Sequence, residues 1–138
     1  MNRQRVAEEL LADEGLRLKP YRCTAGRLTI GVGRNLDERG ITEAEALLLL
    51  DNDIGDCWTR LSANLSWLAA APDPVQEALV NMAFNLGVGG LLGFKDTLEL
   101  LRAEQYAEAA QAMLASKWAR QVGKRAERLA AQVRGAAR

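Results

Sequence analysis

The sequence contains no histidine and only two cysteines, Cys23 and Cys57. Histidine and cysteine are the side chains that bind zinc most often, so this composition argues against a metal site of the usual Cys/His kind. We expect neither a metal nor another cofactor. A disulfide between the two cysteines stays open at this stage, but two free thiols are expected if the chain remains in a reducing compartment.

Long apolar runs are also absent. Of the 138 residues, 49% are hydrophobic, yet no run approaches the roughly 20 residues that a membrane-spanning helix needs. We therefore expect a soluble chain without stable membrane insertion. The first residues lead into a charged amphipathic segment with no apolar signal core, so we expect no signal peptide and retention in a cytoplasm until something else releases the chain. The length indicates one domain.

The formal net charge is zero, but the two signs are distributed unevenly. Seven acidic residues and one basic residue lie between positions 37 and 57, whereas seven basic residues and one acidic residue lie between positions 117 and 138. A locally basic end can meet an anionic polymer. A solvated helix face explains the same charges equally well. We expect no nucleic-acid partner.

Residues 3 to 14 form the first periodic segment. Apolar residues recur there at helical spacing, which predicts an amphipathic helix that Gly15 ends. Glu14 follows Leu10 by four positions and Leu11 by three, so it falls on or beside the apolar stripe. Partial burial and the negative end of the helix dipole are both expected to raise the pKa of Glu14, which favours a proton donor. An ordinary exposed glutamate is the alternative.

A strand-turn-strand pattern follows. Residues 21–23 and 28–32 flank 24–27, and Gly26 is the expected turn residue. A three-residue loop over 25–27 predicts that Cys23 lies directly opposite Thr29, with both side chains on one face. A two-residue loop pairs Cys23 with Leu28 instead. A proton donor such as Glu14 needs polar partners nearby, and only the first register places the thiol and the hydroxyl together on one face as such partners.

These residues resemble the signature of the phage-type lysozymes, glycoside hydrolase family 24. That signature is a glutamate, eight residues, an aspartate or cysteine, five residues and a threonine, and Glu14, Cys23 and Thr29 have this spacing. The resemblance continues almost to the end of the chain, through residues 78–87, 93–94, 109–110, 116–118 and 125–126. It implies an α+β, mostly helical fold with two lobes.

The resemblance also implies how the lobes are divided. A small lobe with a hairpin is expected over about residues 13–42, a linking helix over about 43–61, and a helical C-terminal lobe over about 62–138 that includes the helix at 3–14. Thr42 and Glu45 form a capping box that starts the linking helix. The inward residues of that helix are expected to be Ala46, Leu47, Leu50, Ile54, Cys57 and Leu61. Only about eight residues join the Gly-x-Gly turn to it, so the first lobe should be small.

The C-terminal half contains one segment that is apolar nearly all round. Asp73 is the expected N-cap and Pro74 the first helical residue, so that Val75 to Leu86 form a buried central helix. Residues 87–90 are expected to end it. Three further amphipathic helices then surround it.

The implied activity is that of an endolysin-type muramidase, which hydrolyses the β-1,4 bond between N-acetylmuramic acid and N-acetylglucosamine in peptidoglycan. By resemblance, Glu14 is the general acid, Cys23 replaces the more common aspartate, and Thr29 helps to hold water or product. A neutral thiol stabilises a cationic transition state less than a carboxylate does, whereas a thiolate is a nucleophile or base. Inversion and retention both stay open.

Further substrate contacts are implied position by position. They are Asn35, Phe84, Asn85, Thr97, Lys117 and Arg125, with Lys117 and Arg125 facing the anionic peptide stem. Ala112 departs from the family pattern, which has an asparagine there. Arg34 replaces a histidine, and we expect it to pair with Asp53, worth only about 0 to 1 kcal/mol near the surface.

Two other interpretations compete with the enzyme. A peptidoglycan-binding relative weakened by Cys23 would bind walls without cutting them, and a structural or toxin-associated helical protein would bind no glycan. A nucleotide-binding loop at residues 31–33 is rejected, because Leu36 replaces the third glycine and no strand-helix-strand unit follows. We expect a monomer whose partner is peptidoglycan. A membrane-permeabilising holin is a candidate partner for release.

Overall fold

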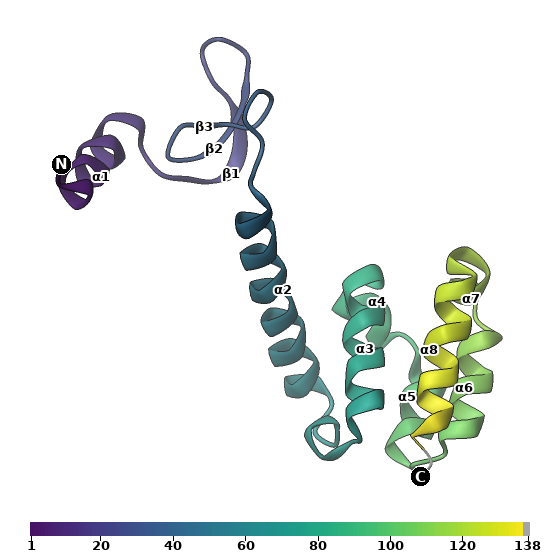
Figure 1. Ribbon diagram of the computed structural model, residues 1–138. Coiled ribbons are helices and arrows are strands. Elements are labelled where there is room, and N and C mark those ends of the chain that lie inside the picture. The colour runs from purple at the N-terminus through teal and green to yellow at the C-terminus, as the bar shows by residue number, and fades with distance from the viewer. Residues whose placement is uncertain (137–138) are drawn as a thin grey trace. The chain divides into compact units, whose positions relative to one another are not determined.

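The computed structural model describes residues 1–136. The chain forms two compact units, Met1–Leu49 and the residues from Leu50 onward, called unit 1 and unit 2 below. Helices predominate, and a small antiparallel sheet lies near the N-terminus (Figure 1), which confirms the expected α+β, mostly helical class. Within the described residues, no helix combines the length and the apolar character that crossing a membrane requires.

Unit 1 contains one helix, a three-stranded sheet and the beginning of a second helix. The elements are α1 (Arg3–Glu14), β1 (Arg17–Arg22), β2 (Leu28–Gly31), β3 (Arg34–Asn35) and the first turns of α2 (Glu43–Asn64). The strands follow the order β1-β2-β3, and both pairings are antiparallel.

Unit 2 contains the rest of α2 and a group of helices, drawn from teal to yellow in Figure 1. They are η1 (Leu68–Ala70), α3 (Asp73–Leu86), α4 (Val88–Leu92), α5 (Lys95–Arg102), α6 (Tyr106–Leu114), α7 (Lys117–Val122) and α8 (Lys124–Gly135). The predicted packing of the helix at 3–14 with the C-terminal lobe concerns both units and stays a prediction.

Helix α1 has the bounds that the sequence predicts. The side chain of Asn2 caps its start, because Oδ1 accepts a hydrogen bond from the Arg5 amide at 3.0 Å. Gly15 ends it with φ 75°, and its amide donates to the Leu11 carbonyl at 3.0 Å. No residue of α1 is buried and Glu14 is exposed. The expected partial burial of Glu14 is therefore wrong.

The hairpin register differs from both registers that the sequence suggests. Tyr21 lies opposite Thr29 and Arg22 opposite Leu28, while the Cys23 amide donates to the Arg27 carbonyl at 2.9 Å. The loop is therefore residues 24–26, closed by the Gly26 amide on the Cys23 carbonyl at 2.8 Å. Gly26 takes the positive φ of 78° that this tight loop needs. Cys23 and Thr29 still share one face, as diagonal neighbours.

The third strand, β3, is an addition to the predicted hairpin. Thr29 pairs with Asn35 and Ile30 with Arg34. Thr29 is therefore the central residue of a three-stranded row, and only 4% of its surface is exposed.

The linking helix α2 begins where predicted and runs three residues further. Its capping box is present: the Glu45 amide donates to Thr42 Oγ1 at 3.1 Å, and the Thr42 amide donates to Glu45 Oε1 at 2.9 Å. The predicted inward face is wrong in part, because Leu47, Leu50 and Ile54 are 41–55% exposed. Only Leu61 is buried, and Cys57 packs at the edge of the core.

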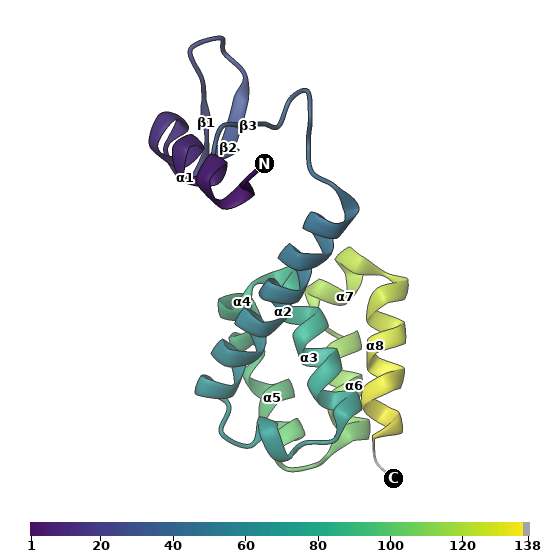
Figure 2. The same cartoon turned by 60° about the vertical axis from the view of Figure 1, so that its left-hand side comes forward.

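The core of unit 2 is built around α3. Val75, Ala78, Leu79 and Met82 are fully buried, and α8 packs against α3, α6 and α7, as the views in Figures 1 and 2 show. The predicted start is off by one position, since Pro72 is the N-cap and Asp73 the first helical residue. Residues 87–90 do not simply end this helix, because Val88 opens α4. Five helices, α4 to α8, follow it within the described residues, where three were expected.

Candidate active site

The carboxylate of Glu14 lies against the backbone of Gly33. A Cβ atom built on Gly33 would be 2.9 Å from Glu14 Oε2 and 3.1 Å from Cδ. Gly33 also has φ +67°, a conformation that residues with side chains rarely adopt. The end of α1 and the turn between β2 and β3 therefore fit together only because residue 33 has no side chain.

Cys23 and Thr29 lie on one face of the sheet in the same unit. The Thr29 hydroxyl donates to the Arg27 carbonyl at 2.8 Å, so its proton is already in use. Hydrogen bonds from the backbone at Arg27 and Ala25 hold the pKa of the Cys23 thiol below its ordinary value. A larger fraction of thiolate near neutral pH follows. Cys23 and Cys57 are both free thiols in this structure.

Several side chains brace the hairpin next to these residues. Asp37 Oδ2 accepts from the Leu28 amide at 2.7 Å, and Arg27 forms an ion pair with Glu38 at 3.1 Å. The Asn35 side chain accepts from the Glu38 amide at 3.1 Å. Asn35, a predicted substrate contact, thus holds its own turn.

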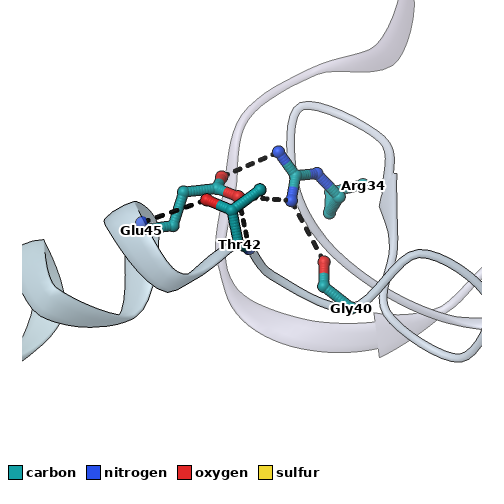
Figure 3. A network of polar contacts seen from close by, with 4 residues as sticks. All are labelled: Arg34, Gly40, Thr42 and Glu45. Carbon is teal, nitrogen blue, oxygen red and sulfur yellow. Dashed lines mark hydrogen bonds and ion pairs between the residues drawn. The ribbon is translucent and has the colours of Figure 1, made fainter.

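Arg34 is held by Glu45 and not by Asp53, so the predicted partner is wrong. The guanidinium donates from NH1 to Glu45 Oε1 at 3.0 Å and from NH2 to Oε2 at 2.7 Å, and NH1 also donates to the Gly40 carbonyl at 3.0 Å (Figure 3). The hydrogen bonds from Arg34, followed by those from Thr42, lower the pKa of Glu45 to about 2. These charged hydrogen bonds therefore join β3, the short link after it and the first turn of α2.

In unit 2, Thr97 and Lys117 line one cavity of about 680 Å³. Thr97 is 4% exposed and Lys117 is exposed. Ala112 lines the same cavity. The wall includes Trp118, which meets Phe94 edge to face with ring centroids 6.3 Å apart.

Asn85 has a structural partner. Its Oδ1 accepts a hydrogen bond from the indole Nε1 of Trp118 at 2.9 Å. Trp118 is only 3% exposed, so this acceptor satisfies a buried donor. Asn85, another predicted substrate contact, therefore holds one wall of the cavity that Lys117 borders.

Phe84 and Arg125 line a second, mostly apolar cavity of unit 2, of about 520 Å³. Phe84 is 46% exposed, so part of its ring is accessible from this cavity. Arg125 donates from Nε to Asn81 Oδ1 at 2.9 Å and from NH2 to the Asn81 carbonyl at 3.1 Å. Its orientation is therefore fixed by α3.

Two of these residues were missed in the sequence. The sequence indicates Glu45 only as half of a capping box, whereas in the structure the same carboxylate also anchors Arg34. Asn81 lies one helical turn before Asn85 on α3, and that spacing was the signal for a second polar position on the helix. Within residues 1–136, no three cysteine or acidic side chains gather closely enough to hold a metal ion.

Comparison with known proteins places this geometry in a family. The family model described as phage lysozyme matches residues 12–135. "Probable T4-type lysozyme 1" of Dictyostelium discoideum is 29% identical over 90% of both chains. "Pre-baseplate central spike protein Gp5" of Enterobacteria phage T4 is 31% identical over 90% of this chain but 26% of its own length. "Endolysin" of Acyrthosiphon pisum secondary endosymbiont phage 1 is 35% identical over 54% of this chain and 52% of its own. The chain belongs to the phage lysozyme family, and its function is that of a lysozyme-type hydrolase.

Proposed function

We propose that the protein is an endolysin-type muramidase with Glu14 as its general acid. The bond cut is the β-1,4 bond between N-acetylmuramic acid and N-acetylglucosamine in bacterial peptidoglycan. The observation that carries this proposal is the arrangement of unit 1, in which the Glu14 carboxylate rests on Gly33 while Cys23 and Thr29 share a face of the adjoining sheet. Relatives named lysozyme and endolysin support the same activity.

Glu14 combines access to the substrate with a restricted position. The side chain is exposed, so a glycosidic oxygen can approach it. Contact with Gly33 limits where its carboxyl group lies. Bound sugar would displace water from the carboxyl group, and loss of water favours the neutral, proton-donating form. Glu14 then protonates the leaving oxygen as the bond to the anomeric carbon breaks.

Cys23 takes the role of the second group. Backbone hydrogen bonds favour its thiolate, as the lowered pKa indicates. A thiolate carries the negative charge that the more common aspartate would supply, and it stabilises a cationic transition state in the same way. The neighbouring Thr29 hydroxyl donates its proton to the Arg27 carbonyl, so only its oxygen lone pairs remain for a further hydrogen bond. It accepts a hydrogen bond from a water molecule or from product.

The cavities of unit 2 are suited to the rest of the polymer. Exposed Lys117 at the edge of one cavity complements the carboxylates of the peptide stem. Phe84 offers an exposed apolar face to a sugar ring in the other cavity. We expect Lys117→Ala to raise KM for peptidoglycan fragments with little effect on kcat, because this charge contacts a part of the substrate that does not react.

The new ends of digested peptidoglycan test the proposed bond. The wall is digested to completion, reduced with borohydride, hydrolysed with acid and analysed for reduced amino sugars. A muramidase leaves reducing N-acetylmuramic acid, so reduced muramic acid should appear in proportion to lysis. Reduced glucosamine would show cleavage of the other glycosidic bond, and ends without a reducing sugar would show a transglycosylase. Either result overturns the proposal.

A peptidoglycan-binding relative without activity is the second candidate. The thiol at Cys23 and the exposure of Glu14 favour it, since each is less suited to catalysis than a carboxylate and a buried acid. This candidate predicts that the chain sediments with purified walls but never clears a turbid wall suspension. Clearing by the parent chain therefore separates the two, and if the parent is inactive, Cys23→Asp should create lytic activity in a site that lacks only a carboxylate.

A further inference from the structure

The contact between Arg34 and Glu45 ties the site to the start of α2. Both carboxylate oxygens of Glu45 accept from the Arg34 guanidinium, at 3.0 Å and 2.7 Å, in the two-pronged geometry that fixes both position and angle. The pair is partly shielded, with side-chain exposure of 22% for Arg34 and 39% for Glu45. A third bond from Arg34 to the Gly40 carbonyl fixes the connecting loop as well. Figure 3 shows these groups converging.

Arg34 directly follows Gly33 in the chain, and Gly33 is the residue on which the Glu14 carboxylate rests. Arg34 also pairs with Ile30 across the sheet, next to the pairing of Asn35 with Thr29. A shift of residues 33–35 would therefore move the support of Glu14 and the neighbour of Thr29 together. One rigid peptide plane joins Gly33 to Arg34, so a displacement of Arg34 also displaces Gly33.

We infer that Glu45 is a positioning residue for the hydrolytic reaction: acting through the Arg34 guanidinium, it fixes Gly33 and thereby the place of the Glu14 carboxylate. The inference rests on the proposed function of Glu14. It assigns to Glu45 a role beyond starting a helix. A lysine at position 34 could not replace the arginine, because an ammonium group is a point charge and cannot span both carboxylate oxygens at fixed geometry.

Glu45→Gln separates this role from helix capping. Glutamine serves at the third position of a capping box as glutamate does, so the cap on Thr42 is kept. The amide nitrogen of glutamine, however, would face a guanidinium N–H and cannot accept from it. The variant therefore removes the two-pronged contact while leaving the start of α2 capped. Glu99→Gln is a matched control, since Glu99 forms a similar contact with Arg102 on the surface of α5.

Three measurements on the full chain test the inference. The nuclear Overhauser effect between the Gly33 α-protons and the Glu14 γ-protons reports their contact directly. Values of kcat and KM on soluble peptidoglycan fragments report catalysis, and circular dichroism sets a temperature at which all variants are equally folded. For Glu45→Gln we expect a weakened Overhauser effect, kcat reduced at least about tenfold and KM within about twofold. Arg34→Lys should lose a similar factor, and Glu99→Gln should match the parent.

The outcomes that overturn the inference differ from those that overturn the proposed function. If the parent chain cuts peptidoglycan and Glu45→Gln has the same kcat at equal folding, Glu45 has no positioning role. The same conclusion follows if kcat falls while the contact between Glu14 and Gly33 is unchanged. A parent chain that cuts no peptidoglycan overturns the proposed function, and the inference falls with it.

Discussion

Glu14 and Gly33 are fitted to each other, with the carboxylate of one lying where the side chain of the other would be. This contact joins the last residue of α1 to the turn between β2 and β3. Residue 33 must therefore be glycine for two reasons: its φ is positive, and the Glu14 carboxylate occupies the space where a Cβ atom would lie. The first requirement concerns stability, and the second concerns the position of the proposed acid.

Substitution of Gly33 separates these two requirements. Gly26→Ala should lower the free energy of unfolding by about 1 kcal/mol, the usual strain of a left-handed backbone, because nothing lies within 4 Å of its Cβ position. Gly33→Ala should cost more and should reduce wall lysis at least about tenfold, since it also displaces Glu14. Urea unfolding and turbidity clearing measure the two effects. Equal losses in both variants would show that the contact with Glu14 has no consequence.

The stability of unit 1 should depend on acid through Glu45. The pKa of this carboxyl group is about 2 in the folded chain against an ordinary value of 4.5, chiefly because of Arg34. A depressed folded pKa means that the charged pair contributes stability above about pH 4.5 and that this contribution is lost as the pH falls toward about 2. The difference in Tm between the parent and Glu45→Gln should therefore be largest near neutral pH. It should shrink through that acidic window. A difference independent of pH would contradict the assignment.

The thiol of Cys23 should react at lower pH than an ordinary cysteine. Backbone hydrogen bonds at Arg27 and Ala25 lower its pKa, so the thiolate, which is the reactive form, persists below the ordinary range. Alkylation by iodoacetamide, followed by mass spectrometry of the peptide that contains Cys23, gives the rate against pH. The pH at which the rate is half-maximal should be lower than for a short unstructured peptide with the sequence of residues 20–26. Coincident curves would remove the electrostatic argument for Cys23 as a substitute carboxylate.

Asn85 should have one role in stability and another in binding. Asn85→Ala leaves the buried indole N–H of Trp118 without its acceptor and should cost about 1 kcal/mol or more of unfolding free energy. Asn85→Asp keeps an acceptor oxygen and should retain most of that stability. If Asn85 also contacts substrate, Asn85→Asp should raise KM at unchanged stability, because it removes the amide donor and adds a charge near the anionic peptide. Unchanged KM would limit Asn85 to its structural role.

The sequence predicts the elements of the site better than their contacts. The bounds of α1 follow from apolar spacing and from Gly15, both of which are local signals. No comparable local signal determines the hairpin register. Several loops fit the residues between Cys23 and Leu28, and the observed loop over 24–26 depends on where Gly26 takes its positive φ. The shared face survives the error, because moving the pairing by two residues preserves the alternation of side chains.

The partner of Arg34 was beyond sequence reasoning for a different reason. Asp53 and Glu45 are both acidic residues of α2, and the choice between them depends on the path of residues 36–42. Gly40, with φ 60°, bends that path so that its carbonyl and the Glu45 carboxylate reach the same guanidinium. Similarly, periodicity predicts that Leu47, Leu50 and Ile54 share a face of α2. It does not tell whether another element covers that face, and these residues are largely exposed.

The initial rate at which the chain clears a suspension of purified peptidoglycan tests the central claim most directly. It should be compared among the parent, Glu14→Gln and Glu9→Gln, a matched control at an exposed position of the same helix. All three should unfold at the same temperature, since neither glutamate is buried. The account predicts that Glu9→Gln clears the suspension as fast as the parent and that Glu14→Gln loses at least about a hundredfold. Clearing by Glu14→Gln at the parental rate would contradict it.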